Sequence, residues 1–334
     1  MNYFIEVITQ NKAKTDIDTI YKQLGYTNLT PIRKSINPVS RFIVKLIGVI
    51  RILTKLRKGD TLFLQYPMKK FYFTACTFAH WRKAKVTTII HDLGAFRRHK
   101  LTPDQENRRL RKTDFLIAHN DTMKQYLVDH GFKNKLVSLH IFDYLTDTQP
   151  KKYDTPHSPW KVVYAGGLHQ WRNPFLYKLD SHMQTWEMDL YGPGFNQQEN
   201  KNEKITYHGN LAPETLMEQM EADFGLVWDG SSLDECDGDW GSYLKINNPH
   251  KTSLYIRAGI PVIVWSKAAM KPFILENGLG FAVNSLSEID HILSKMTPKE
   301  YQKMREAAKK YARMLGSGHF ASQRFNEAIS FLTE

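Results

Sequence analysis

Two series of short β-like runs, each alternating with helix-like segments, constrain the fold of this chain more than any other feature of its sequence. Strands that alternate with helices form parallel sheets covered on both faces, so the pattern predicts an α/β protein. The 334 residues predict two domains, at about 150 residues each. The expected strands lie at 3–8, 61–65, 86–91, 115–118 and 136–139, and then at 161–164, 186–191, 204–207, 224–228, 262–265 and 280–283.

The polar segment 147–159 carries three prolines and is typical of an interdomain linker. We therefore expect an N-terminal domain over 1–150 and a C-terminal domain over 151–317. A last amphipathic segment, 318–334, follows a Gly-Ser-Gly break, and we expect it to pack back on the N-terminal domain. Further helices are expected near 16–24, 42–56 and 122–129.

The segment that begins at Asn247 predicts a phosphate site. Asn248 is a good helix cap and Pro249 a good first helical residue, which puts Lys251 in the first turn. The helix dipole disfavours a cation there, and a bound anion would remove the conflict. Exposed amides at a helix N-terminus, together with Lys251 and the adjacent Thr252, suit a phosphate group. A solvated lysine on an ordinary helix is the alternative.

Glycine turns after the strands of the second half mark the edge where open α/β sheets bind ligands. Gly166 and Gly167 follow the first of these strands and let the backbone approach a ligand, although a tight turn alone would explain them. Arg172 lies shortly after them, ahead of an expected helix. It is a candidate contact for a diphosphate, with a surface arginine as the alternative.

Two further strand ends add candidates in the same domain. A similar turn follows at 191–194, and Tyr207 and His208 precede another. The strand 224–228 is followed by Asp229, whose carboxylate is a candidate contact at the same edge.

An acidic loop in the second half invites a metal site, because Asp237 and Asp239 have a spacing that could hold Mg²⁺ or Mn²⁺ with substrate phosphates. Lys251 and Arg172 could neutralise a diphosphate without a metal. We therefore expect no metal ion and no other cofactor.

In the first half, His91 and Asp92 end a buried strand at the edge expected to face the second domain. Either side chain could act as a base toward an acceptor hydroxyl or orient substrate hydroxyls, whereas a packed histidine and a capping aspartate are the structural alternative. Lys14 and Thr15 lie between the first strand and the first helix, which makes them candidate cleft contacts. A helix cap formed by Thr15 or Asp16 would explain them as well.

The 46 Lys and Arg against 34 Asp and Glu give a formal net charge of +12, which favours an anionic partner. Nucleotide phosphate, anionic lipid and nucleic acid all fit this charge, but no nucleic-acid-binding module is recognisable, and we expect no nucleic acid partner. The segment 40–58 and the basic runs 97–100 and 108–112 could lie on an anionic membrane surface. A core helix with solvated lysines explains the first segment equally well.

Location is indicated by three features. The first residues have the pattern of a strand rather than a signal peptide, and no stretch reaches the roughly 18 apolar residues of a membrane span. The chain has two cysteines, Cys76 and Cys236, far apart and without metal-ligand spacing. We expect a cytoplasmic protein, at the inner face of the cell membrane if the basic segments contact lipid.

The run 247–265, with 276–281 after it, resembles bacterial galactofuranosyltransferases and the related adhesin glucosyltransferases of streptococci. Both groups are GT-B glycosyltransferases. The strand 224–228 and the His91-Asp92 strand end are similar too, so the resemblance covers both domains in the same order. It implies two Rossmann-like domains facing across a cleft, with the donor nucleotide held mainly by the second domain and transfer without a metal ion.

The resemblance also implies roles for particular residues. Lys251 corresponds to the lysine at the start of that helix, and Arg172 roughly to an arginine after the glycine turn. A tyrosine that these relatives use after the third strand has no clean counterpart, and its role could fall to Tyr207 or His208.

The resemblance implies a UDP-sugar donor and a glycan acceptor. We prefer galactofuranosyl transfer from UDP-galactofuranose in surface polysaccharide biosynthesis, because the basic first half suits a lipid-linked acceptor. Glucosyl or N-acetylglucosaminyl transfer from a UDP-sugar to a glycosylated adhesin is one alternative, and a noncatalytic partner subunit is another. The oligomeric state stays open, with a homo-oligomer among the alternatives.

Overall fold

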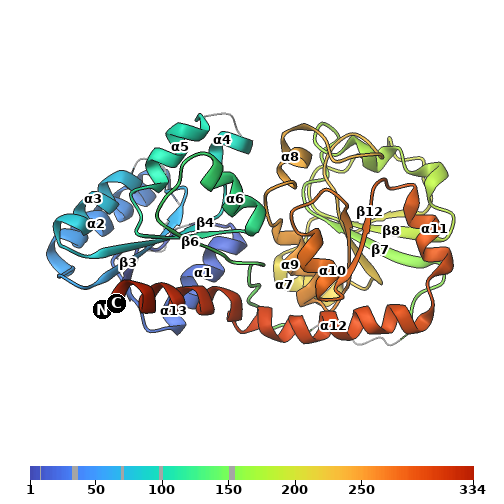
Figure 1. Cartoon of the computed structure of the whole chain (residues 1–334). Helices are drawn as coiled ribbons and strands as arrows, with labels where there is room; N and C mark the ends of the chain where they lie inside the picture. Colours follow the sequence, from blue (N-terminus) through green and yellow to red (C-terminus); the bar gives the residue numbers. More distant parts are fainter. Residues whose placement is uncertain (8, 32–36, 69–70, 98–100, 150–154) are drawn as a thin grey trace. The chain divides into compact units, whose positions relative to one another are not determined.

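The computed structural model describes residues 1–7, 9–31, 37–68, 71–97, 101–149 and 155–334, which form two compact units (Figure 1). Unit 1 consists of Met1–Asp143 together with Gly318–Glu334, and unit 2 of Tyr144–Ser317. The segment 318–334 thus belongs with unit 1. The expected boundary at residue 150 and the middle of the expected linker lie outside the described residues, as do residue 8 of the first predicted strand and 98–100 of the basic run.

Unit 1 is built on a six-stranded parallel sheet with the order β2-β1-β3-β4-β5-β6. β3 is buried along its whole length, as expected for a central strand covered on both faces. The predicted α/β class is confirmed. The strands are β1 (Asn2–Phe4), β2 (Thr27–Asn28), β3 (Thr61–Tyr66), β4 (Lys85–Ile90), β5 (Phe115–Ala118) and β6 (Lys135–Ser138).

Helices cover both faces of this sheet (Figure 1). On one face, Tyr21 of α1 and Phe63 of β3 contact Phe325 of α13, with ring centroids 4.7 and 5.5 Å apart. On the other face, α2 and α3 lie side by side. The helices of unit 1 are α1 (Lys12–Gln23), α2 (Pro38–Lys55), α3 (Tyr72–Trp81), α4 (Gly94–Arg97), α5 (Pro103–Leu110), α6 (Asp121–Asp129) and α13 (His319–Thr333).

Unit 2 carries a second six-stranded parallel sheet, with the order β12-β11-β10-β7-β8-β9. Counted within the unit, this is the order of the Rossmann fold, and it reverses between β7 and β10. The strands are β7 (Trp160–Ala165), β8 (Trp186–Tyr191), β9 (Ile205–Tyr207), β10 (Phe224–Val227), β11 (Val262–Trp265) and β12 (Gly280–Val283). The helices are α7 (Pro213–Gln219), α8 (Gly238–Tyr243), α9 (His250–Arg257), α10 (Lys271–Glu276), α11 (Glu288–Lys295) and α12 (Pro298–Gly316).

Several predicted element ends are wrong. The first strand ends at Phe4, and α1 begins at Lys12, four residues earlier than expected. The reason is that Asn11 caps α1, with its Oδ1 accepting the backbone N–H of Lys14 at 3.2 Å. α3 and α5 were not predicted.

No helix within the described ranges has both the length and the apolar composition needed to cross a bilayer.

Candidate functional site

The strand order of unit 2 reverses between β7 and β10, and ligands of open α/β sheets bind outside the carboxyl ends of strands at such a reversal. Gly166 and Gly167 follow β7, and Asp229 lies just after β10. The N-terminal turn of α9 adds Lys251 to the same place, because its side chain reaches Asp229. The structure therefore brings together residues that are up to 85 positions apart, counted from 166 to 251.

Lys251 points into the unit, and its side chain is only 11% exposed. Its Nζ lies 3.0 Å from Oδ2 of Asp229 and donates to the hydroxyl of Tyr164 at 2.9 Å. It also donates to the carbonyl of Trp228 at 3.1 Å. The carboxylate of Asp229 thus relieves the conflict between Lys251 and the dipole of α9. A bound anion is therefore not required to remove this conflict, and phosphate contact by Lys251 stays a prediction.

Arg172 shares the same carboxylate. Its Nη2 lies 2.9 Å from Oδ1 of Asp229, and its guanidinium lies over the ring of Trp240, 3.7 Å from the centroid. Burial by itself raises the pKa of Asp229, but Lys251 and Arg172 outweigh burial and hold that pKa below its ordinary value. Two cations therefore face one ionised carboxylate, which leaves one net positive charge at the strand ends.

The glycine turns of unit 2 stack on one another at this edge. A Cβ on Gly192 would lie 1.8 Å from the carbonyl oxygen of Gly166, so only glycine allows the two turns to approach this closely. Gly192 also donates its N–H to the carbonyl of Gly209 at 2.8 Å. The hydroxyl of Tyr207 donates to the carbonyl of Gly192 at 2.9 Å. Tyr207 thus supports the turns beside Lys251 and Arg172, which together with Asp229 we call the cationic cluster.

His208 has a different environment from Tyr207. Its Nε2 lies 2.9 Å from Oδ1 of Asp189, and its ring stacks on Tyr191 with centroids 4.7 Å apart. Asp189 and Tyr191 belong to β8, so His208 is tied to that strand. Both residues stay predictions as donor contacts.

The start of α9 differs from the predicted one by one residue. Pro249 is extended, with ψ of 132°, and is itself the residue before the first helical one, so Asn248 is not the helix cap. Asn248 is buried beside it. Thr252 is fully buried, and its Oγ1 has no hydrogen-bond partner among the described residues. A buried hydroxyl without a hydrogen-bond partner lowers the stability of the folded state, so Thr252 remains a candidate ligand contact in the first turn of α9.

A cavity of about 320 Å³ opens next to Arg172. Trp171, which is largely exposed, and Trp240 line it together with residues of the polar loop 230–237. Within that loop, Asp237 accepts from the backbone N–H and the hydroxyl of Ser231, and so shapes the loop. The cavity offers aromatic surface and polar groups side by side. The residues that line it are Trp171, Arg172, Pro174, Gly230, Ser231, Asp237, Gly238, Asp239 and Trp240.

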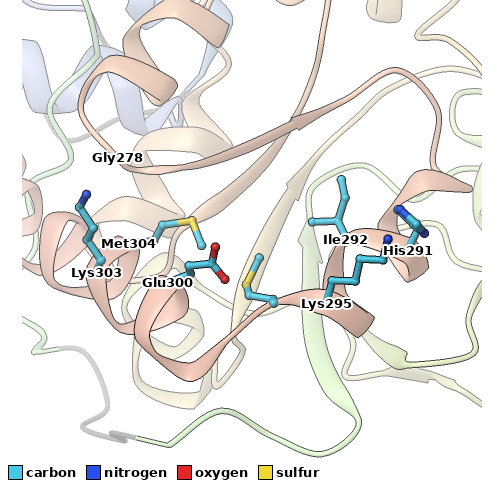
Figure 2. Close-up of a pocket in the computed structure, with 8 residues that line it drawn as sticks. Gly278, His291, Ile292, Lys295, Glu300, Lys303 and Met304 are labelled. Atoms are coloured by element: carbon cyan, nitrogen blue, oxygen red, sulfur yellow. The ribbon is translucent and has the colours of Figure 1, made fainter.

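A second cavity of unit 2, of about 500 Å³, lies between α11 and α12 (Figure 2). Ile292 of α11 and Met304 of α12 line it, with Lys295 and Lys303 at its sides. Gly278, which also lines it, precedes β12, so the cavity lies by the amino ends of the strands. Open α/β sheets bind ligands at the other edge, where Lys251 lies.

The candidates in unit 1 lie at the carboxyl end of β4. Oδ2 of Asp92 accepts from Nη1 of Arg97 at 3.1 Å, and the His91 ring stacks on Phe142 with centroids 5.4 Å apart. His91 and Asp92 therefore share a strand end but have separate partners. Their use in catalysis stays a prediction.

Lys14 and Thr15 lie in the first turn of α1 rather than in a loop. The hydroxyl of Thr15 donates to the carbonyl of Lys12 at 2.9 Å, and the carbonyl of Lys14 accepts from Nε2 of Gln65 at 3.2 Å. The cap at this helix is Asn11, so neither Thr15 nor Asp16 has that role. Ligand contact by Lys14 or Thr15 stays a prediction.

Three residues of the site were missed by sequence reasoning. Tyr164 touches Lys251, Trp240 covers Arg172, and the hydroxyl of Tyr255 accepts the N–H of Ala165 at 2.7 Å, which holds the turn after β7. Tyr164 lies two residues before Gly166 and could have been found from the glycine turn. Nothing local in the sequence indicates that Trp240 stacks on an arginine 68 positions away, counted from 172 to 240.

Comparison with known proteins places both parts of the chain in one family. Residues 5–141 match the model "Glucosyltransferase 3-like, N-terminal domain", and residues 162–328 match "Glucosyltransferase 3-like, C-terminal domain". The β-1,6-galactofuranosyltransferase WbbI of Escherichia coli (strain K12) is 30% identical over 322 residues, covering 96% of this chain and 93% of the relative. Glucosyltransferase 3 of Streptococcus gordonii is 27% identical over 335 residues, covering 95% and 93%.

A solved structure of a glycosyltransferase from Rickettsia africae ESF-5 has the same fold, with a TM-score of 0.58, 13% identity, and coverage of 100% of this chain and 98% of that one. The two parallel sheets and these relatives together identify the chain as a glycosyltransferase of the GT-B type. The predicted class, including the prediction of an enzyme, is confirmed. The chain belongs to the glucosyltransferase 3-like family.

Proposed function

We propose that the chain transfers galactofuranose from UDP-galactofuranose to a glycan acceptor in surface polysaccharide biosynthesis. The support is the 30% identity, over 96% of the chain, to a β-1,6-galactofuranosyltransferase. Glucosyl or N-acetylglucosaminyl transfer from a UDP-sugar to a glycosylated adhesin is the second candidate. The family model and the 27% identity to glucosyltransferase 3 favour it.

The cationic cluster of unit 2 carries the proposal. Lys251 and Arg172 share the single carboxylate of Asp229, so the cluster has one positive charge that a diphosphate can neutralise. When the bond to the sugar breaks, negative charge grows on the departing diphosphate. Cations that are already in position stabilise that charge without reorganisation, which accelerates the step. In this proposal the two side chains supply the positive charge, and no metal ion is needed.

The aromatic cavity beside Arg172 suits the sugar of the donor. A sugar ring has apolar C–H faces that pack on indoles and hydroxyls that bond polar groups. Trp171 and Trp240 provide the indoles, and Ser231 and Asp239 line the same cavity. Because Arg172 lines it too, a sugar in this cavity would lie next to a diphosphate held by Arg172.

The remaining parts of the proposal concern the acceptor and its base. In this proposal His91 or Asp92, both at a strand end of unit 1, acts as the base that takes the proton from the acceptor hydroxyl. We also propose a lipid-linked acceptor and a cytoplasmic reaction. The net charge of +12 supports the first, and two buried, unpaired cysteines support the second.

A thermal-shift titration tests the donor site. UDP, UDP-galactofuranose, UDP-glucose, UDP-N-acetylglucosamine and GDP are compared with and without EDTA, because a ligand that binds only the folded state raises its stability. Lys251→Ala should weaken UDP binding roughly 10- to 100-fold, the range for a lost hydrogen bond to a charged group. Lys310→Ala, at an exposed lysine of α12, is the matched control and should bind UDP normally.

The outcomes separate the alternatives. Stabilisation by UDP compounds despite EDTA supports a donor site that works without a metal, and the order of the sugars ranks the donors. Normal UDP binding by Lys251→Ala would refute the role of the cluster. Transfer is then followed by mass spectrometry with the best donor, and a preference for UDP-glucose over UDP-galactofuranose would favour the second candidate.

A further inference from the structure

Helix α2 presents an apolar stripe to solvent. Its members lie at the spacing of one helix face, and each is between 37% and 66% exposed. A helix on a water-facing surface normally has polar residues at such positions. Five apolar residues in one row are more than the scattered exposed side chains of ordinary surfaces. They are Val39, Phe42, Ile43, Leu46 and Ile50.

This stripe is not the face by which α2 is attached to unit 1. That face consists of Val44, Gly48, Val49 and Ile52, which are buried. At Gly48 the helix comes so close that a Cβ would lie 3.0 Å from a methyl group of Thr30. The helix is therefore already packed on the unit, and its exposed apolar residues are additional to those that the fold uses.

Helix α3 lies beside α2 (Figure 1) and has exposed apolar side chains of its own. The two helices touch at both ends: Phe42 packs on Phe71 with ring centroids 5.2 Å apart, and Nε of Arg82 donates to the carbonyl of Leu56 at 2.9 Å. On α3, Phe73 is 38% and Trp81 67% exposed. We call the exposed residues of both helices the α2–α3 face: Val39, Phe42, Ile43, Leu46, Ile50, Phe73 and Trp81.

The Lys, Arg, Asp and Glu residues of the two segments that form this face are all basic, and an acid from outside these segments, Asp114, lies 3.0 Å from Nε2 of His80. The sequence contains no Asp or Glu from 37 to 58 or from 71 to 83. Over the same positions it contains eight Lys and Arg residues, namely Arg41, Lys45, Arg51, Lys55, Arg57, Lys58, Arg82 and Lys83. Exposed apolar side chains, a tryptophan among them, on segments that contain Lys and Arg but no Asp or Glu are typical of helices that lie in the interface of anionic bilayers.

We propose that the α2–α3 face docks on the surface of an anionic lipid bilayer. Its apolar side chains enter the boundary between headgroups and acyl chains, while the surrounding cations contact the headgroups. A second copy of the chain fits less well, because pairing this face with itself would bring the same cations together, and neither segment contributes an Asp or Glu to balance them. The inference rests on the surface of unit 1 alone and is independent of the proposed donor site.

Vesicle sedimentation tests the proposal with the full chain. Vesicles of phosphatidylcholine alone are compared with vesicles that contain about one-third phosphatidylglycerol. We expect about tenfold more bound protein on the anionic vesicles, with a loss of this excess at high salt. Leu46→Glu/Ile50→Glu should lower binding about tenfold. Val128→Glu and Leu275→Glu are matched controls, because these residues are 47% and 45% exposed outside the face.

Two results would overturn the proposal: no excess binding of the wild type to anionic vesicles, or equal binding of the double variant and the wild type. Light scattering adds a third. If the wild type is a dimer that does not bind vesicles, and the double variant is a monomer, a second copy of the chain is the occupant of this face. An unchanged circular-dichroism spectrum and melting temperature of the double variant, measured without ligand, show that it is folded. Because UDP binding and vesicle binding are read separately, the failure of one leaves the other standing.

Discussion

At the scale of single residues, Asp229 sets the charge of the candidate donor site. Its two carboxylate oxygens take one cation each, Arg172 on Oδ1 and Lys251 on Oδ2. The Asp229 carboxylate neutralises one of the two positive charges, which stabilises the largely buried cations when no substrate is bound. The remaining positive charge still attracts an anionic ligand. The residue therefore acts on stability and on donor affinity in opposite directions.

Asp229→Asn should separate these two effects. Without ligand, the variant leaves both cations without a counter-charge, and loss of one partner of a buried ion pair costs about 3–5 kcal/mol of unfolding free energy. UDP should then stabilise the variant more than the wild type, because its diphosphate replaces the missing charge. Melting temperatures with and without UDP measure both effects, with the exposed Asp234→Asn as control. An unchanged melting temperature of the ligand-free variant would contradict the argument.

Asp18 in α1 links the stability of unit 1 to pH. It is buried, and burial raises its pKa to about 8, although Val7 N–H and Gln65 Nε2 donate to it at 2.8 and 2.7 Å. The unfolded chain releases this proton near pH 4, about the ordinary value for Asp. Between these values the folded state binds more protons, so rising pH removes stability, by up to about 1.4 kcal/mol per pH unit.

Asp18→Asn should remove this contribution to the pH dependence of stability. The amide keeps an oxygen for Val7, and its NH₂ can donate to Oε1 of Gln65 once that amide rotates, an atom with no partner among the described residues. Urea unfolding between about pH 5 and pH 9 compares the variant with the wild type. Asp129→Asn, at an exposed residue of α6, should leave the slope as it is. Parallel pH profiles of Asp18→Asn and the wild type would refute the buried proton.

At the residue level, local patterns in the sequence indicate positions but not their partners. Lys251 follows from the start of its helix and Gly166 from the end of its strand, and the structure places both at one edge. The partner of Lys251 could not be predicted, because the fold brings Asp229 to it from another strand. The same holds for Trp240, whose stacking on Arg172 depends on how a loop closes.

At the scale of elements, the strands were predicted better than the helices. Strands such as β11 are short runs of buried apolar residues, a pattern that needs no knowledge of the fold. α3 is apolar on nearly all sides, so it lacks the helical periodicity that prediction uses. α5 is rich in charged residues and was interpreted as part of a basic surface, although Thr102 and Gln105 form a capping box at its start.

The stacked turns of unit 2 make a prediction about elements. Gly192→Ala forces the turn after β8 away from the carbonyl of Gly166, and thereby displaces the glycine turn beside Arg172 and Lys251. We expect about tenfold weaker UDP binding, with loss of about 1–3 kcal/mol of stability from backbone strain. Gly209→Ala is the control, because Gly209 also has a positive φ but nothing lies within 4 Å of the added Cβ. Equal UDP affinities for the two variants would contradict the expectation.

At the scale of the whole molecule, unit 1 is made from two separate stretches of the chain. α13 completes it: Phe325 packs against both Tyr21 and Phe63, and Asp143 accepts the N–H groups of Phe320 and Ala321 at 3.1 and 2.7 Å. This return of 318–334 was expected from the sequence because an amphipathic helix follows a glycine break. The residues it would contact could not be predicted, since no local pattern links position 325 to 21 and 63.

The same arrangement governs the order of events during synthesis. A ribosome makes most of unit 1 first, but it must translate all of Tyr144–Ser317 before the closing helix exists. Until then Tyr21 and Phe63 lack their contacts with Phe325. Unit 2 lies in one uninterrupted stretch and can fold as soon as it emerges. The first domain to be started is therefore the last to be finished, and a stop codon within the final helix would destabilise the domain that the N-terminal part of the sequence forms.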